Sequence, residues 1–131
     1  MTDLANLDAI VKNQEEGIDL PVKHPVTGEP IGITLRVLGY ESDKVRSLQR
    51  RQINQRLKNQ RKRLTAEEIE GNGRAVQVAA VVGWSFTDGV TLDGAVPEFN
   101  EKGVEALLKR FPFIARQIDE IADDASAFLE N

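Results

Sequence analysis

The aromatic residues, concentrated in the last third of the chain, constrain the fold more than any other feature. Aromatics make up only 5% of the 131 residues, and the single Trp and all five Phe lie after residue 83. A buried ring removes roughly 150–250 Å² from water, so this region has to supply much of the hydrophobic core. We therefore expect Trp84 to pack in the core. An exposed anchor for a partner is the alternative role for Trp84 and for Phe113.

Residues 100–129 have the pattern of a helix pair. Asn100 can cap the first helix, and Pro112 can stop that helix and begin the next one. Apolar residues recur along the second helix at three- and four-residue steps, which predicts an amphipathic helix with an acidic outer face. Asp119 and Asp123 lie on that acidic face and are candidates for contact with a partner.

The first third of the chain predicts strands. Apolar and polar residues alternate in two runs around a turn rich in Pro and Gly, which is typical of a β-hairpin and covers residues 18–38. Pro21 has no N–H, so the first strand should be an edge strand. A short amphipathic helix is expected before it, ended by Gly17. We expect one α+β domain over residues 1–131, mostly α, in which an N-terminal hairpin is followed by three or four main helices.

The segment after the hairpin predicts a basic helix over residues 43–63, capped by Ser42 or Asp43. Its apolar residues are sparse and do not form one broad stripe. Such a helix projects into solvent or binds a partner.

A second helix is predicted over residues 66–84. Thr65 and Glu68 have the spacing of a capping box at its start, and Trp84 is expected to close it. A loop should then lead to the C-terminal helix pair.

Charge is unevenly distributed along the chain, although the net charge is only −4. Residues 43–63 carry nine basic and one acidic side chain, whereas residues 84–131 carry four basic and ten acidic ones. A molecule with a basic helix and an acidic face is suited to head-to-tail contacts between copies, which give rings or open stacks. We predict that three arginines of the basic helix contribute to self-association: Arg50, Arg51 and Arg56.

Two other interpretations of the basic helix are a solvated surface and a nucleic-acid-binding face over residues 44–63. Nucleic acid is disfavoured because no aromatic side chain lies between Val45 and Leu64 to stack on a base. The acidic character of the whole chain also opposes it.

No residue pattern indicates catalysis, a cofactor or a metal. The chain has no Cys and a single histidine, His24, which we interpret as a turn side chain at the end of the hairpin. Gly71-Asn72-Gly73 lacks the Gly-Lys-Ser/Thr ending of a phosphate loop. No apolar run approaches the roughly 20 residues of a membrane span, and the start of the chain does not resemble a signal peptide. We expect a cytoplasmic protein that is not an enzyme and has no membrane partner.

Several motifs, which together span most of residues 18–129, resemble one known family. On them the chain is similar to the tail assembly chaperones of bacteriophages with long, non-contractile tails. The motifs are KHPVTGEPIGIT at residues 23–34, the Arg-rich helix from Asp43, Gly83-Trp84, the loop from Asp93-Gly94 to Asn100, RFPFI at residues 110–114 with Gln117 following, and the terminal Phe128-Leu129.

The resemblance implies a chaperone that binds the long tape-measure protein and keeps it soluble until the tail tube polymerises around it. It implies a protein that acts in the host cell cytoplasm and is absent from the finished virion. It also implies a longer form of the same protein, made by a programmed frameshift, as a further partner. A structural tail component retained in the virion is the alternative.

Overall fold

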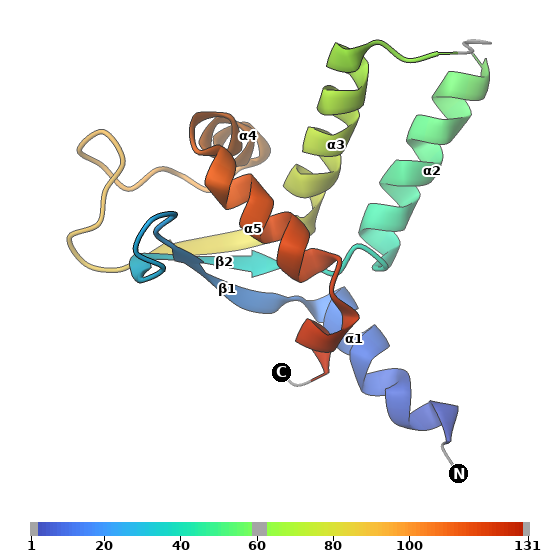
Figure 1. The fold of residues 1–131 in the computed structure, drawn as a ribbon, viewed down its shortest axis with the longest axis horizontal. Helices are drawn as coiled ribbons and strands as arrows, with labels where there is room; N and C mark the ends of the chain where they lie inside the picture. The colour runs from blue at the N-terminus through green and yellow to red at the C-terminus, as the bar shows by residue number, and fades with distance from the viewer. Residues whose placement is uncertain (1–2, 59–62, 130–131) are drawn as a thin grey trace.

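The protein combines helices with one three-stranded antiparallel sheet, so the predicted α+β class is confirmed. The computed structural model describes residues 3–58 and 63–129, and Figure 1 shows their arrangement. A helix precedes the hairpin, and a third strand joins it. In chain order the elements are the 3-10 helix η1 (Leu4–Leu7), α1 (Asp8–Glu16), β1 (Ile18–Lys23), β2 (Pro30–Val37), α2 (Asp43–Lys58), α3 (Ala66–Ala80), β3 (Val81–Phe86), α4 (Glu101–Arg110), α5 (Pro112–Ala122) and the 3-10 helix η2 (Ala125–Phe128).

The predicted hairpin is formed by β1 and β2. The strands are antiparallel, with Ile18 opposite Val37, and the sheet order β1-β2-β3 makes β1 an edge strand. This confirms the expectation drawn from Pro21. Near the end of β1, the side chain of Gln117 on α5 forms hydrogen bonds with the backbone of the strand.

Strand β3 corrects the helix predicted over residues 66–84. The helix α3 ends at Ala80, and the strand begins at the next residue. In the sheet Trp84 lies opposite Leu35, and its side chain is on the same face as that core residue. The valines and aromatic rings of β3 suit a pleated, half-buried surface. Because β2 offers a second edge for pairing, this tertiary contact overrides the helical pattern of the apolar run that begins at Ala75.

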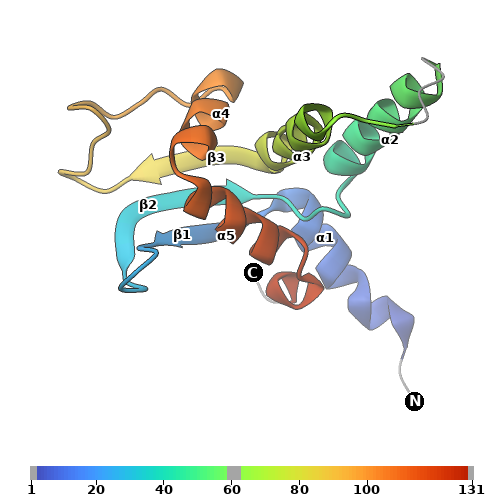
Figure 2. The same cartoon turned by 45° about the horizontal axis from the view of Figure 1, so that its top comes forward.

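The hydrophobic core lies on one face of the sheet, where α5 crosses the strands (Figure 2). Alternate residues of β1 and β2 point into it, which explains the alternating sequence pattern. The largest core side chains, each at most 2% exposed, are Phe128, Leu35, Leu108, Ile114, Ile118, Val22, Val37, Val45 and Val104.

The C-terminal helix pair begins as predicted, but its second helix is shorter than expected. The Asn100 side chain accepts a hydrogen bond from the Gly103 N–H at 2.7 Å, and α5 begins at Pro112. This helix ends at Ala122. The Asp124 side chain accepts from the Ser126 N–H and begins η2 instead, which buries Phe128 by a separate turn.

The basic helix is described over Asp43–Lys58. Residues 59–62 of the predicted helix lie outside the described residues, and Arg63 is not helical. Its N-terminus is capped from another element: the Glu15 carboxylate accepts from the Asp43 N–H at 2.7 Å and 2.9 Å. The buried Ser42 hydroxyl does not cap it and has no hydrogen-bond partner among the described residues. The negative charge of Glu15 at the N-terminus of α2 also interacts favourably with the positive end of the helix dipole.

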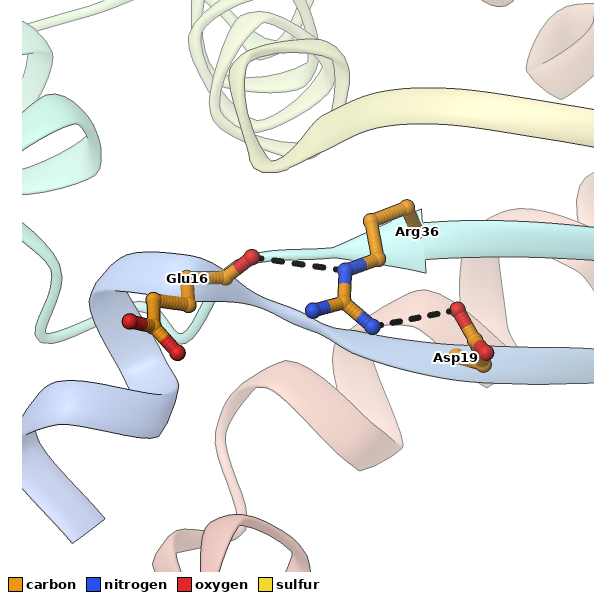
Figure 3. A network of polar contacts seen from close by, with 3 residues as sticks. All are labelled: Glu16, Asp19 and Arg36. Carbon is orange, nitrogen blue, oxygen red and sulfur yellow. Dashed lines mark hydrogen bonds and ion pairs between the residues drawn. The ribbon is translucent and has the colours of Figure 1, made fainter. Parts of the chain in front are cut away.

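The opposite face of the sheet carries small and polar residues. There the Arg36 side chain donates to the Glu16 carbonyl at 3.3 Å and to Asp19 Oδ1 at 3.2 Å (Figure 3). These contacts join the end of α1 to both strands of the hairpin.

Within residues 3–58 and 63–129, no helix is long and apolar enough to cross a membrane.

Candidate functional site

A groove of 450 Å³ lies over α3, between α2 and α4. The three helices stand next to one another with α3 in the middle in both ribbon views (Figures 1 and 2). We call it the basic groove. Its lining residues are Lys44, Leu48 and Arg51 of α2, Gly71, Arg74, Ala75, Val78 and Ala79 of α3, and Glu101, Lys102, Glu105 and Lys109 of α4.

The floor of the basic groove is made by small residues of α3. Gly71, Ala75 and Ala79 recur at four-residue steps, so they lie on one face of the helix. Their short side chains leave space that Leu48 and Val78 border with apolar surface. The Gln52 side chain donates to the Asn72 carbonyl at 3.0 Å and holds α2 alongside α3. The groove is therefore a consequence of residue size on a packed helix.

The walls of the basic groove carry five basic and two acidic side chains. Lys109 forms an ion pair with Glu105 at 2.9 Å. The hydrogen bond from Lys109, its charge and, more weakly, the charge of Arg74 lower the pKa of the Glu105 carboxyl. Within the described part of the chain, Lys44, Arg51 and Lys102 have no ion pair. The groove thus combines an apolar floor with unneutralised positive charge, which suits an acidic amphipathic helix.

The three arginines predicted for self-association do not share one site. Arg51 lines the basic groove. Arg50 is exposed on α2 and donates to the Ser47 hydroxyl at 3.2 Å, and Arg56 is exposed nearer the end of the described helix. Of the three arginines, Arg51 therefore belongs to a concave surface, and the part of all three in self-association stays a prediction.

Asp119, predicted as a partner contact, takes part in a network within its own chain. It accepts hydrogen bonds from the Tyr40 hydroxyl and from Gln77 Nε2, the latter at 2.9 Å. Gln77 in turn accepts from Arg74 at 3.0 Å, so the network reaches the wall of the basic groove. Burial of Tyr40, followed by its contact with Asp119, raises the pKa of the Tyr40 hydroxyl. Asp123 is exposed at the end of α5.

The two aromatic candidates are half-buried. Trp84 packs edge-to-face against Phe86 and Phe99, with centroid distances of 5.8 Å and 5.2 Å. Its Nε1 donates to the Pro97 carbonyl at 3.2 Å. Phe113 lies 6.0 Å from the ring of Phe111, again edge-to-face. Both rings pack against the core, as the core interpretation of Trp84 expects.

Two exposed apolar surfaces were not assigned from sequence. The first is on the outer half of the α2–α3 pair, beyond the level fixed by Gln52 and Asn72. We call it the helix-pair tip, and its residues Ile53, Leu57 and Ile69 are 57%, 70% and 58% exposed.

The second surface is on the segment of residues 3–11, which we call the N-terminal arm. Leu4, Leu7 and Val11 on it are 76%, 44% and 64% exposed. Their helical spacing was visible in the sequence, but only the structure shows that the body of the protein does not cover them.

His24 has the turn role predicted for it. Its Nδ1 accepts from the backbone N–H groups of Val26 at 3.1 Å and Thr27 at 3.3 Å, and so stabilises the turn of the hairpin. Across the described residues, no group of three or more His, Cys, Asp or Glu side chains is arranged to hold a metal ion.

Comparison with known proteins adds no relative to this picture. No protein-family model, no curated protein and no solved structure matches the chain.

Proposed function

We propose that the protein is a non-enzymatic chaperone of phage tail assembly that binds the tape-measure protein and keeps it soluble. The sequence resemblance suggests this role. The strongest structural support is the helix-pair tip, where three large aliphatic side chains are more than half exposed at the end of a projecting helix pair. Exposed apolar side chains at helical spacing on a soluble scaffold are what a binder of aggregation-prone helices requires.

The proposed mechanism uses many weak contacts. A tape-measure protein is long and largely helical, so it offers many apolar segments along its length. Each helix-pair tip covers one short segment of the tape-measure protein. When several copies join side by side, their weak individual contacts add up to strong overall binding. The contacts have to be reversible, because the tube subunits must later replace the chaperone.

Nucleic acid is a weaker candidate for the basic surface. The basic groove includes the carboxylates of Glu101 and Glu105, and the rings of Trp84 and Phe113 pack elsewhere. Phosphate binding would favour a wall without acids and an aromatic platform for bases. Salt-sensitive binding to DNA of arbitrary sequence would support the nucleic-acid alternative.

The test is co-expression of the chain with the tape-measure protein of its own gene cluster, followed by size-exclusion chromatography with light scattering. We expect a soluble complex with several copies per tape-measure chain. Replacement of Ile53 and Leu57 by Ser should return the tape-measure protein to the insoluble fraction. Val26→Ser is the matched control, because Val26 is 86% exposed but lies in the turn of the β-hairpin.

The proposal fails if the tape-measure protein is insoluble with the wild-type chain and also with the longer frameshifted form. It also fails if the Ile53 and Leu57 variant solubilises the tape-measure protein as well as the wild type does. Detection of the protein in purified particles would favour the structural tail component instead.

A further inference from the structure

The N-terminal arm extends away from the rest of the protein (Figures 1 and 2). The direction of the arm is fixed by three consecutive residues near the C-terminal end of α1, each of which is hydrogen-bonded to a different segment. Asn13 donates to the Phe128 carbonyl at 2.7 Å, and Gln14 accepts from the Glu41 N–H at 3.0 Å. Glu15 caps α2. The helix is therefore anchored at one end, and the other end overhangs the body.

The overhanging part carries an apolar stripe with acidic neighbours. Leu4, Leu7 and Val11 are spaced by three and four residues, so they share one face. The next position on that face, Gln14, is buried against the body at 5% exposure. The stripe thus begins as a packed surface and continues into solvent. Residues 3–11 contain two acids, Asp3 and Asp8, and no basic residue.

The basic groove has the complementary properties. Its floor is apolar and made of small residues, and its walls contribute five basic and two acidic side chains. The arm and the groove match in shape, since one is a convex helix and the other a concave space between two helices. They also match in charge, which sets orientation and partner choice.

We propose that the basic groove of one copy binds the N-terminal arm of a second copy. Leu4, Leu7 and Val11 pack on the groove floor beside Leu48 and Val78. Asp3 and Asp8 face the wall cations that form no ion pair within the described residues, among them Arg51. Arg51 would then bind the arm of a second copy and not the acidic face of its α5. On that face, Asp119 already accepts hydrogen bonds from Tyr40 and Gln77.

The contact has to be intermolecular. The arm points away from α3 in both ribbon views, and the bonds of residues 13–15 hold it there. An arm that enters a different surface on the next copy makes a heterologous contact, which gives rings or open stacks. The inference goes beyond the proposed function and does not depend on it, because it concerns the chain alone.

The first test uses the absence of Cys from the natural chain. A copy with Leu7→Cys is mixed with a mass-tagged copy with Ala75→Cys and treated with a short thiol-specific cross-linker. We expect a covalent heterodimer that forms more than about tenfold faster than with Val26→Cys in place of Leu7→Cys. Equal rates for the arm and for the Val26 control would overturn the proposal.

The second test is the mass of the chain by sedimentation velocity at low salt. The wild type should form oligomers, and Leu4→Ser with Val11→Ser should raise the apparent dissociation constant by about tenfold or more, because two large apolar contacts are lost. Val26→Ser should leave it unchanged. Asp8→Arg and Arg51→Glu should each weaken association, and a chain carrying both should recover it.

A wild-type chain that stays monomeric at every concentration would overturn the proposal. Oligomers unaffected by the arm substitutions would do the same. A monomeric chain would also remove the side-by-side joining of copies from the proposed mechanism, but the chaperone function itself is decided by the solubility of the tape-measure protein in a separate experiment.

Discussion

Gln117 on α5 binds the backbone of Lys23 in β1 as a neighbouring strand would. The Lys23 N–H donates to Gln117 Oε1 at 2.9 Å, and Gln117 Nε2 donates to the Lys23 carbonyl at 2.8 Å. Pro21, two residues earlier, has no N–H to offer. One side chain and one proline therefore reduce the number of unpaired backbone groups that this edge presents to other chains.

We predict that Gln117→Ala lowers the free energy of unfolding by about 1–2 kcal/mol, because both hydrogen bonds are lost. Urea unfolding followed by circular dichroism measures it. Gln55→Ala is the control, since Gln55 is exposed on α2, and it should change stability by less than about 0.5 kcal/mol. Equal stability of the Gln117→Ala variant and the wild type would show that water replaces the side chain without cost.

We predict that stability falls as the pH rises above about 10, where a tyrosine of ordinary pKa ionises. Burial and the contact with Asp119 raise the pKa of Tyr40 in the folded state. The unfolded state therefore loses its proton first, so the stabilisation is complete below that pH and declines above it. Tyr40 is the only tyrosine, and its tyrosinate absorbance should appear together with unfolding. Ionisation near pH 10 in a folded protein would contradict this.

Two glycines should respond to alanine with opposite signs. A Cβ at Gly39 would overlap the side chain of Gln14, so Gly39→Ala should destabilise the protein by about 1–3 kcal/mol and loosen the anchor of α1. A Cβ at Gly73 would meet no atom within 4 Å, and Gly73→Ala in α3 should stabilise it by about 1 kcal/mol. Thermal unfolding of the two variants gives the comparison, and a shared sign would refute it.

Charge reversal in α2 should weaken self-association. We expect Arg51→Glu to have the largest effect, because Arg51 lines the basic groove, and Arg50→Glu and Arg56→Glu to have smaller ones. Long-range charge explains the smaller effects, and they should fade as salt is raised. Sedimentation velocity at low and high salt is the measurement. If all three variants keep the wild-type mass at low salt, these arginines have no part in assembly.

Local sequence signals predicted much of the fold. Thr65 and Glu68 form the predicted capping box, Asn100 caps α4, and Pro112 begins α5. Gly17 ends α1 with a positive φ of 86°, which glycine adopts without strain. These features depend on residues close in sequence, and so a pattern of a few positions is enough to identify them.

What the sequence could not predict depends on residues far apart in the chain. Residues 81–86 are a strand because β2 is there to pair with them, and the basic groove exists because three helices pack side by side. The cap of α2 comes from Glu15, 28 residues away from Asp43. Asp119 is an acidic surface residue by pattern, but its pairing with Tyr40 spans 79 residues.

The direct junction between α3 and β3 gives the protein an internal optical reporter. No residue separates Ala80 from Val81, so a tilt of the helix under the basic groove is not absorbed by a loop and is passed to the strand. Trp84, the only tryptophan, is the fourth residue of that strand, and its ring lies against Phe99. Occupation of the groove should therefore register in tryptophan fluorescence, with no label added to the chain.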